Sequence, residues 1–271
     1  MSRRILLFAS FALLVALLPA QEKAPPKSDL VQTQVGTLPI ILSAPHGGTK
    51  DVPDVPARKG LGLEKGGKGF YAGRDVGTEE LTNAVAQAIE KAMSAKPYFV
   101  VARFHRKYID ANRPPDIAYE DPGAKPTYDA YRDTLAGYCR EVKKTHGRGL
   151  LLDLHGQGSQ PDTIIRGSNN GKTVQLLVQR YGVTAHTGPR SLFGFLAADG
   201  AKVNPADGNG KEVPGLSGGD IVRTYGSEAY GLDAYQLEFG GEYRDKDKQK
   251  ETAEKVASAV AKYAKLYLME K

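Results

Sequence analysis

Short apolar runs alternate with longer amphipathic segments along most of this chain, and that alternation constrains the fold more than any other feature. Apolar runs at residues 38–42, 98–102, 149–154, 163–166 and 235–239 predict strands. Helical spacing of apolar side chains predicts helices over residues 75–94, 128–145, 173–181 and 246–271. Strands that alternate with helices are typical of the α/β class. We therefore expect a single domain with a mixed, mostly parallel sheet flanked by helices.

Composition excludes several classes of function. The 271 residues include 37 Lys or Arg and 31 Asp or Glu, which gives a formal charge of +6. No block of basic residues accompanies this mild excess, so a nucleic-acid partner is not expected. The single cysteine, Cys139, excludes an intramolecular disulfide and a cysteine-rich zinc or iron–sulfur site. Any metal must therefore be held by carboxylates and by some of the five histidines.

The N-terminal residues resemble an export signal. Arg3 and Arg4 precede an apolar run at residues 5–18, and Ala20 supplies the small residue that signal peptidase accepts. The alternative is a membrane anchor, but the run is shorter than the roughly 20 residues that a spanning helix needs. We expect a signal peptide at residues 1–20, a flexible segment at 21–35, a catalytic domain at 36–271, and an exported protein, periplasmic or secreted, with no stable membrane anchor.

Two histidines stand out by their positions. His46 and His155 each follow an apolar run and precede a glycine. The carboxyl ends of strands form the ligand crevice in open α/β sheets, so both histidines are expected to face a cleft. Two histidines and one carboxylate, with a position left for water, form a common catalytic zinc set. Asp75 is the best carboxylate candidate, although it also occupies the place of a simple helix N-cap.

Glu238 is a carboxylate between Leu237 and Phe239 in the last apolar run. Burying a carboxylate without a partner is costly. If this run is an inner strand, Glu238 requires a cation, a metal-bound water or a polar cleft. If the run is an edge strand, Glu238 lies in solvent and has no catalytic role.

Four motifs in order resemble the N-formylglutamate amidohydrolase family and, more distantly, zinc carboxypeptidases and aspartoacylases. They are SAPHGG, YIDANR, LLDLHG and LEFG, and the resemblance runs from about Leu38 to Phe239. The resemblance implies a zinc-carboxypeptidase-like (phosphorylase/hydrolase-like) fold with a Zn²⁺ site. It implies His46 and His155 as metal ligands, Glu238 as the activator of the zinc-bound water, Arg106 as the group that polarises the scissile carbonyl, Asn112 and Arg113 as the binders of the substrate carboxylate, and Asp110 as the partner of a ligand histidine.

The third metal ligand departs from the carboxypeptidase pattern. Carboxypeptidases take their acidic ligand three residues after the first histidine, where this chain has Thr49. The formylglutamate-type group has a later Asp-x-x-Thr, which Asp75 and Thr78 match. Further candidates for this ligand are Asp51, Glu64 and Glu79.

Together these features predict an exported zinc-dependent amidohydrolase. Its reaction would cleave an amide next to a carboxylate in a small N-acyl amino acid or a peptide, with Glu238 as the general base. One alternative is a serine hydrolase, because residues 215–219 read GLSGG around Ser217. No apolar strand leads into that segment and no histidine follows it. A second alternative is a secreted binding protein that keeps the cleft without catalysis.

Overall fold

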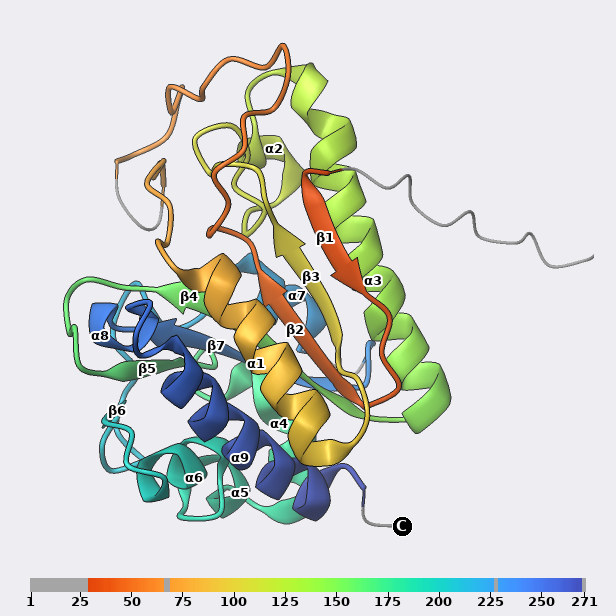
Figure 1. The fold of residues 1–271 in the computed structure, drawn as a ribbon, viewed down its shortest axis with the longest axis vertical. Helices are drawn as coiled ribbons and strands as arrows, with labels where there is room; N and C mark the ends of the chain where they lie inside the picture. Colours follow the sequence, from red (N-terminus) through yellow and green to blue (C-terminus); the bar gives the residue numbers. More distant parts are fainter. Residues whose placement is uncertain (1–28, 66–68, 227–228, 270–271) are drawn as a thin grey trace, which may run out of the picture.

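The computed structural model describes residues 29–65, 69–226 and 229–269, and its core is one sheet covered by helices on both faces (Figure 1). Within these residues seven strands form the sheet in the order β1-β3-β2-β4-β7-β5-β6. The strands are β1 (Val31–Gln34), β2 (Ile40–Ala44), β3 (Tyr98–Ala102), β4 (Gly149–Gly156), β5 (Ile164–Gly167), β6 (Val203–Asn204) and β7 (Leu232–Phe239).

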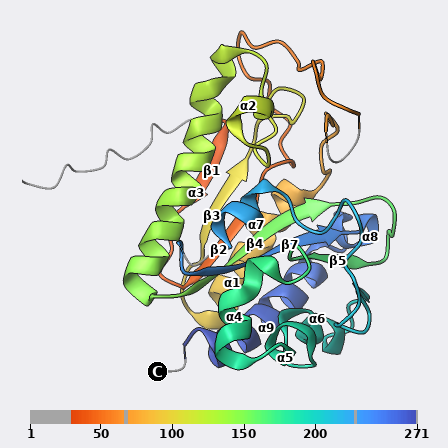
Figure 2. The same cartoon turned by 180° about the vertical axis from the view of Figure 1, so that it is seen from behind.

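Nine α-helices are assigned in the described residues, and three of them are long. The helices are α1 (Thr78–Met93), α2 (Pro115–Ala118), α3 (Lys125–His146), α4 (Gln175–Tyr181), α5 (Thr184–Thr187), α6 (Leu192–Ala198), α7 (Asp220–Tyr225), α8 (Gly241–Arg244) and α9 (Gln249–Tyr267). Helices α1 and α9 lie side by side over one face of the sheet (Figure 1), while α3 and α7 cover the other (Figure 2).

The two faces have separate apolar cores. Helices α1 and α9 pack Leu81, Ile89 and Val260 against one side of the central strands. Helix α3 packs Tyr131 and Leu135, and α7 packs Ile221 and Val222, against the other side. Strands covered on both faces read as continuous apolar runs, which explains why β2 and β3 are buried along their whole length.

Parallel pairing brings the functional ends of the central strands together. Strand β2 pairs in parallel with β3 and β4, and β4 pairs in parallel with β7. The β4–β7 register places His155 directly opposite Glu238. Because these strands run the same way, their carboxyl ends form one edge, where ligands bind in this class of fold.

The structure confirms the mostly parallel α/β architecture and changes some details. Residues 31–34, expected in a flexible segment, instead form β1, which pairs antiparallel with β3. The first long helix begins at Thr78 rather than at Asp75. Strand β7 is an inner strand between β4 and β5, so Glu238 does not lie at a sheet edge.

Residues 1–28 lie outside the described part of the chain, and with them the expected signal peptide. Across the described ranges, no helix combines the length and apolar character that a membrane span requires. Cys139 is buried, as expected of a structural thiol.

Candidate metal centre and active site

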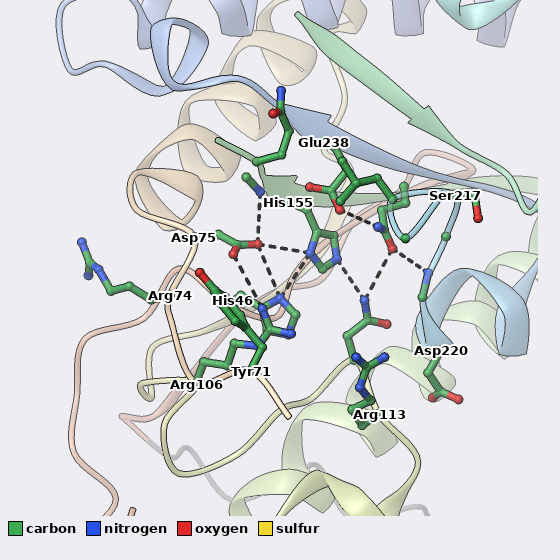
Figure 3. A pocket seen from close by; sticks show the side chains of 18 of the residues that line it. His46, Tyr71, Arg74, Asp75, Arg106, Arg113, His155, Ser217, Asp220 and Glu238 are labelled. Atoms are coloured by element: carbon green, nitrogen blue, oxygen red, sulfur yellow. Dashed lines mark hydrogen bonds and ion pairs between the residues drawn. The ribbon is translucent and has the colours of Figure 1, made fainter. Parts of the chain in front are cut away.

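His46, Asp75 and His155 converge at the carboxyl edge of the sheet (Figure 3). His46 follows β2, His155 is near the end of β4, and Asp75 precedes α1. The two Nδ1 atoms are 3.2 Å apart, and Asp75 Oδ2 lies 3.4 Å from the first and 3.2 Å from the second. All three residues are buried. Three ligand atoms thus form a nearly equilateral triangle.

Two further carboxylates fix how the histidine rings are oriented. Asp110 Oδ1 is 2.7 Å from His46 Nε2, and Asp153 Oδ2 is 2.8 Å from His155 Nε2. An ionised carboxylate can only accept, so each Nε2 carries the hydrogen. Ser43 Oγ in turn donates to Asp153 Oδ1 at 2.6 Å. This arrangement leaves both Nδ1 lone pairs directed at Asp75, as in carboxylate–histidine–metal arrangements.

The triangle fits a metal ion of the zinc type. Three acceptor atoms in close contact repel one another unless a cation lies between them. In a tetrahedral zinc site with bonds of about 2.0–2.1 Å, neighbouring ligand atoms are about 3.3 Å apart. The separations of 3.2–3.4 Å match that value. The surrounding carboxylates also favour positive charge here, since they raise the pKa of His155 well above its usual range although burial opposes this.

The chain around Asp75 holds its carboxylate in the cluster instead of at the helix end. Its backbone N donates to the His46 carbonyl at 2.9 Å, and its carbonyl accepts the Thr78 hydroxyl at 2.8 Å. The N-cap of α1 is Gly77, with a left-handed φ of 86° and no side-chain cap. Burial would raise the pKa of Asp75, but its close contact with the His155 and His46 rings lowers it well below its usual range.

The other carboxylates considered for this position lie elsewhere. Asp51 is exposed and accepts from Tyr108 and pairs with Lys107. Glu79 pairs with Arg103 at 3.3 Å, and Glu64 is exposed. Among the described residues, the only group of three or more His, Cys, Asp or Glu with metal-binding spacing is His46, Asp75 and His155.

Glu238 lies beside this cluster and is nearly fully buried, with 4% of its surface exposed. Burial raises its pKa to about 7. Gln236 Nε2 donates to Glu238 Oε1 at 2.6 Å, and the Gly219 amide donates to Gln236 Oε1 at 2.7 Å. The second bond fixes the orientation of the Gln236 amide, so its NH₂ group faces the carboxylate. A buried carboxylate with a raised pKa, beside a metal site, is suited to accept and return a proton.

The remaining predicted residues, Arg106, Asn112 and Arg113, line the same cavity. Arg106 donates to Asp110 Oδ2 through Nε at 3.0 Å and Nη2 at 2.8 Å, and its Nη1 is 3.8 Å from Asp75. The Asn112 side chain accepts from the Ile221 amide at 2.8 Å, so it ties the YIDANR loop to α7. Its Nδ2 is 3.2 Å from His155 Nε2.

The cavity has a volume of about 1080 Å³ and brings both histidines and Glu238 into one cleft. Ser217 lines it from a loop that has no strand before it, so the GLSGG segment does not form a nucleophile elbow. Sequence analysis did not identify several lining or supporting residues, namely Tyr71, Arg74, Asp153, Gln236 and Arg244. Asp153 could have been identified as the one charged residue in an apolar run two positions before His155, on the same face of a strand.

Comparison with known proteins supports the fold. No protein-family model and no curated protein sequence matches the chain. Among solved structures, N-formylglutamate amidohydrolase from Ralstonia eutropha is similar, with a TM-score of 0.55 and 16% identity over 90% of this chain and 98% of that chain. A gene product from Agrobacterium tumefaciens gives a TM-score of 0.55 and 16% identity over 88% and 96% of the two chains.

The fold is similar to that of the Ralstonia N-formylglutamate amidohydrolase. The predicted resemblance is therefore confirmed at the level of architecture, over nearly the whole length of the Ralstonia protein. At 16% identity the comparison shows a similar architecture and does not assign chemical roles to residues.

Proposed function

We propose that this chain is a zinc-dependent amidohydrolase that cleaves an amide bond next to a carboxylate. The observation that carries the proposal is the triangle of His46 Nδ1, His155 Nδ1 and Asp75 Oδ2, with Glu238 beside it in the same cavity. Two histidines, one carboxylate and a nearby free carboxylate match the needs of metal-assisted amide hydrolysis. The substrate is a small N-acyl amino acid or a peptide.

Each residue has a separate task in this reaction. A zinc ion held by His46, Asp75 and His155 would lower the pKa of a water and polarise the amide carbonyl. Glu238 takes the proton of the attacking water and returns it to the departing nitrogen. Its hydrogen bond from Gln236 holds Oε1 and leaves the other oxygen for the proton.

Two arginines act on the substrate. Arg106 is held by Asp110 through Nε and Nη2, so Nη1 is left to stabilise the negative charge that develops on the carbonyl oxygen. Arg113 lines the cavity and anchors the substrate carboxylate, for which a planar guanidinium is well suited. Asn112 binds the same carboxylate, and its side chain also accepts from the Ile221 amide and so holds the start of α7.

Metal analysis and an amide screen test the proposal together. Purified protein should bind one zinc per chain and hydrolyse members of a panel of N-acyl amino acids and short peptides. His155→Ala and Asp75→Ala should each lose tight binding, because two remaining ligands make a poor site. Asp51→Ala removes a nearby carboxylate outside the cluster and should keep its zinc. Full zinc occupancy in His155→Ala, or no hydrolysis of any amide by the zinc-loaded protein, contradicts the proposal.

We further propose that the protein is exported and that the mature chain begins near Gln21. Support comes from the basic, apolar and small-residue order of residues 1–20. N-terminal sequencing of protein from a cell fractionation should return a mature chain outside the cytoplasm. Soluble protein that retains Met1 would contradict export.

A further inference from the structure

Five arginines line the catalytic cavity. Arg74 and Arg244 form what we term the first arginine pair, and Arg113 and Arg223 form the second. The fifth, Arg106, lies next to the metal ligand Asp75. Three carboxylates also line the cavity, and they are Asp75, Asp220 and Glu238.

The first arginine pair belongs to the face covered by α1. Arg74 directly precedes the ligand Asp75, and its Nη1 donates to the Gly47 carbonyl at 3.3 Å. Arg244, at the end of α8, donates to the carbonyls of Phe239, Val76 and Gln157. Carbonyl groups satisfy hydrogens but carry no net charge, so these bonds leave both positive charges in place, although Arg244 also feels the carboxylates of Asp75, Glu238 and Asp245. Glu79, which feels the charge of Arg74, already pairs with Arg103.

The second arginine pair belongs to the opposite face, which α7 covers. Arg223 lies on α7 and is exposed, and Arg113 comes two residues before the start of α2. Asp220 is the lining carboxylate at this end, but it pairs with Arg132 at 2.7 Å and so does not cancel Arg223. In Figure 3, Arg74 and Arg113 lie on opposite sides of the His46–Asp75–His155 cluster. Positive charge therefore flanks the reaction centre from both faces of the sheet.

From this arrangement we infer that the substrate carries an anionic group on each side of its scissile amide. The inference rests on the proposed function, which places that amide at the metal ligands. The chemical class is an N-acyl amino acid whose acyl group bears its own carboxylate, or an acidic peptide with the same charge pattern. Arginine recognises carboxylates through paired hydrogen bonds, and two separated cationic ends select a ligand with two separated anions. A cavity of about 1080 Å³ has room for both halves.

Four matched ligands test the inference. The acyl half is either succinyl, which carries a carboxylate, or butanoyl, which does not; the other half is either alanine or alaninamide. Binding of each ligand is measured by calorimetry on zinc-loaded Glu238→Gln protein, and kcat/KM is measured on the wild-type enzyme. Succinyl-alanine should bind about tenfold to a hundredfold more tightly than either ligand with one carboxylate, the usual contribution of a charged hydrogen bond.

Two arginine variants identify which arginine pair recognises which carboxylate of the ligand. In the same protein, Arg74→Gln should remove the advantage of one carboxylate and Arg223→Gln the advantage of the other. Arg190→Gln changes a surface arginine between α5 and α6, outside the cavity, and should leave all four affinities unchanged. Equal binding of succinyl-alanine and butanoyl-alanine, or loss of the same advantage in both variants, overturns the inference.

The failure of the inference is distinguishable from failure of the proposed function. Hydrolysis without any preference for the succinyl group would leave the amidohydrolase proposal intact and overturn the two-anion inference. Preferential binding of succinyl-alanine without hydrolysis of any amide would overturn the amidohydrolase proposal and leave recognition of two anions by the cavity intact.

Discussion

His46 and His155 owe their orientation to carboxylates that do not touch the metal position. Asp110 and Asp153 each hold an Nε2 hydrogen, which directs the Nδ1 lone pairs at Asp75. Asp153 is fully buried and is itself held by Ser43. The ligand geometry therefore depends on residues next to the histidines as much as on the histidines.

Asp153→Asn tests this dependence. The amide has the same shape but removes the charge that makes His155 a strong ligand. Zinc affinity should fall by about 10- to 100-fold, the usual effect of losing such a partner. Competition with a chelator of known affinity measures the change, and circular dichroism checks the fold. Wild-type zinc affinity in a folded Asp153→Asn protein would show that the carboxylate has no effect on the ligand.

Glu238→Gln separates the proposed general base from the proposed metal ligands. Glutamine has nearly the same shape but cannot accept the proton of the water, so turnover should fall by about 10²- to 10⁴-fold. Zinc content should stay at the wild-type level, because Glu238 is outside the cluster. Elemental analysis and steady-state kinetics provide the two readouts. Lost zinc would make Glu238 a ligand, and unchanged turnover would place the base elsewhere.

Among the secondary-structure elements, the contact between the PHGG turn and the start of α1 positions Asp75. A Cβ on Gly47 would clash with the backbone nitrogen of Glu79 in the first turn of α1. The glycine thus permits close approach of the helix. The same approach allows the Asp75 amide to donate to the His46 carbonyl.

Gly47→Ala should therefore displace the start of α1 and weaken zinc binding without touching a ligand. We expect at least a tenfold loss of zinc affinity, together with a destabilisation of about 1–3 kcal/mol from overpacking. Denaturant unfolding and metal competition measure the two effects. Gly62→Ala is a matched control, because a Cβ there meets open space. Although Gly62 has a φ of 74°, and its replacement strains the backbone, zinc affinity should not change.

The predictable elements are those whose sequence reflects burial. Strands β2, β3 and β4 are continuous apolar runs, and their ends mark His46 and His155. Strand β1 was missed because its sequence VQTQ has no apolar run and it is only partly buried. Asp153 was missed as a partner, although it is the one charged residue of its apolar run and lies two positions before His155 on the same face of the strand.

The cavity walls could not be predicted, because separate regions of the chain supply them. Arg74 comes from the loop before α1, Arg223 from α7 and Arg244 from α8. Only the order of strands in the sheet brings these regions to one edge. Local sequence does not encode that order.

At the scale of the whole molecule, a buried histidine away from the active site links stability to pH. His186 lies between the Tyr235 hydroxyl and Ser168, and burial lowers its pKa to about 4. The unfolded chain binds a proton at this residue below about pH 6.5, while the folded protein remains neutral there. The contribution of His186 to stability is therefore complete above pH 6.5 and is lost as the pH falls toward 4.

His186→Gln should flatten this dependence. Between pH 7 and pH 4, the wild-type free energy of unfolding should fall further than that of the variant, by up to about 3 kcal/mol. Urea unfolding at several pH values measures the difference between the two proteins, so that other titrating groups cancel. Parallel pH profiles in the two proteins would show that His186 is not the group responsible.

The three atoms of the metal triangle come from distant parts of the chain. His46 and His155 are separated by 109 residues, and Asp75 and His155 by 80. In an unfolded chain such loops keep the donors apart, so the ion has no preformed place to bind. The triangle closes only after β2 pairs with β4 and α1 docks on the sheet. If the proposed zinc binds here, its uptake would be coupled to folding and would mark the completion of the central sheet.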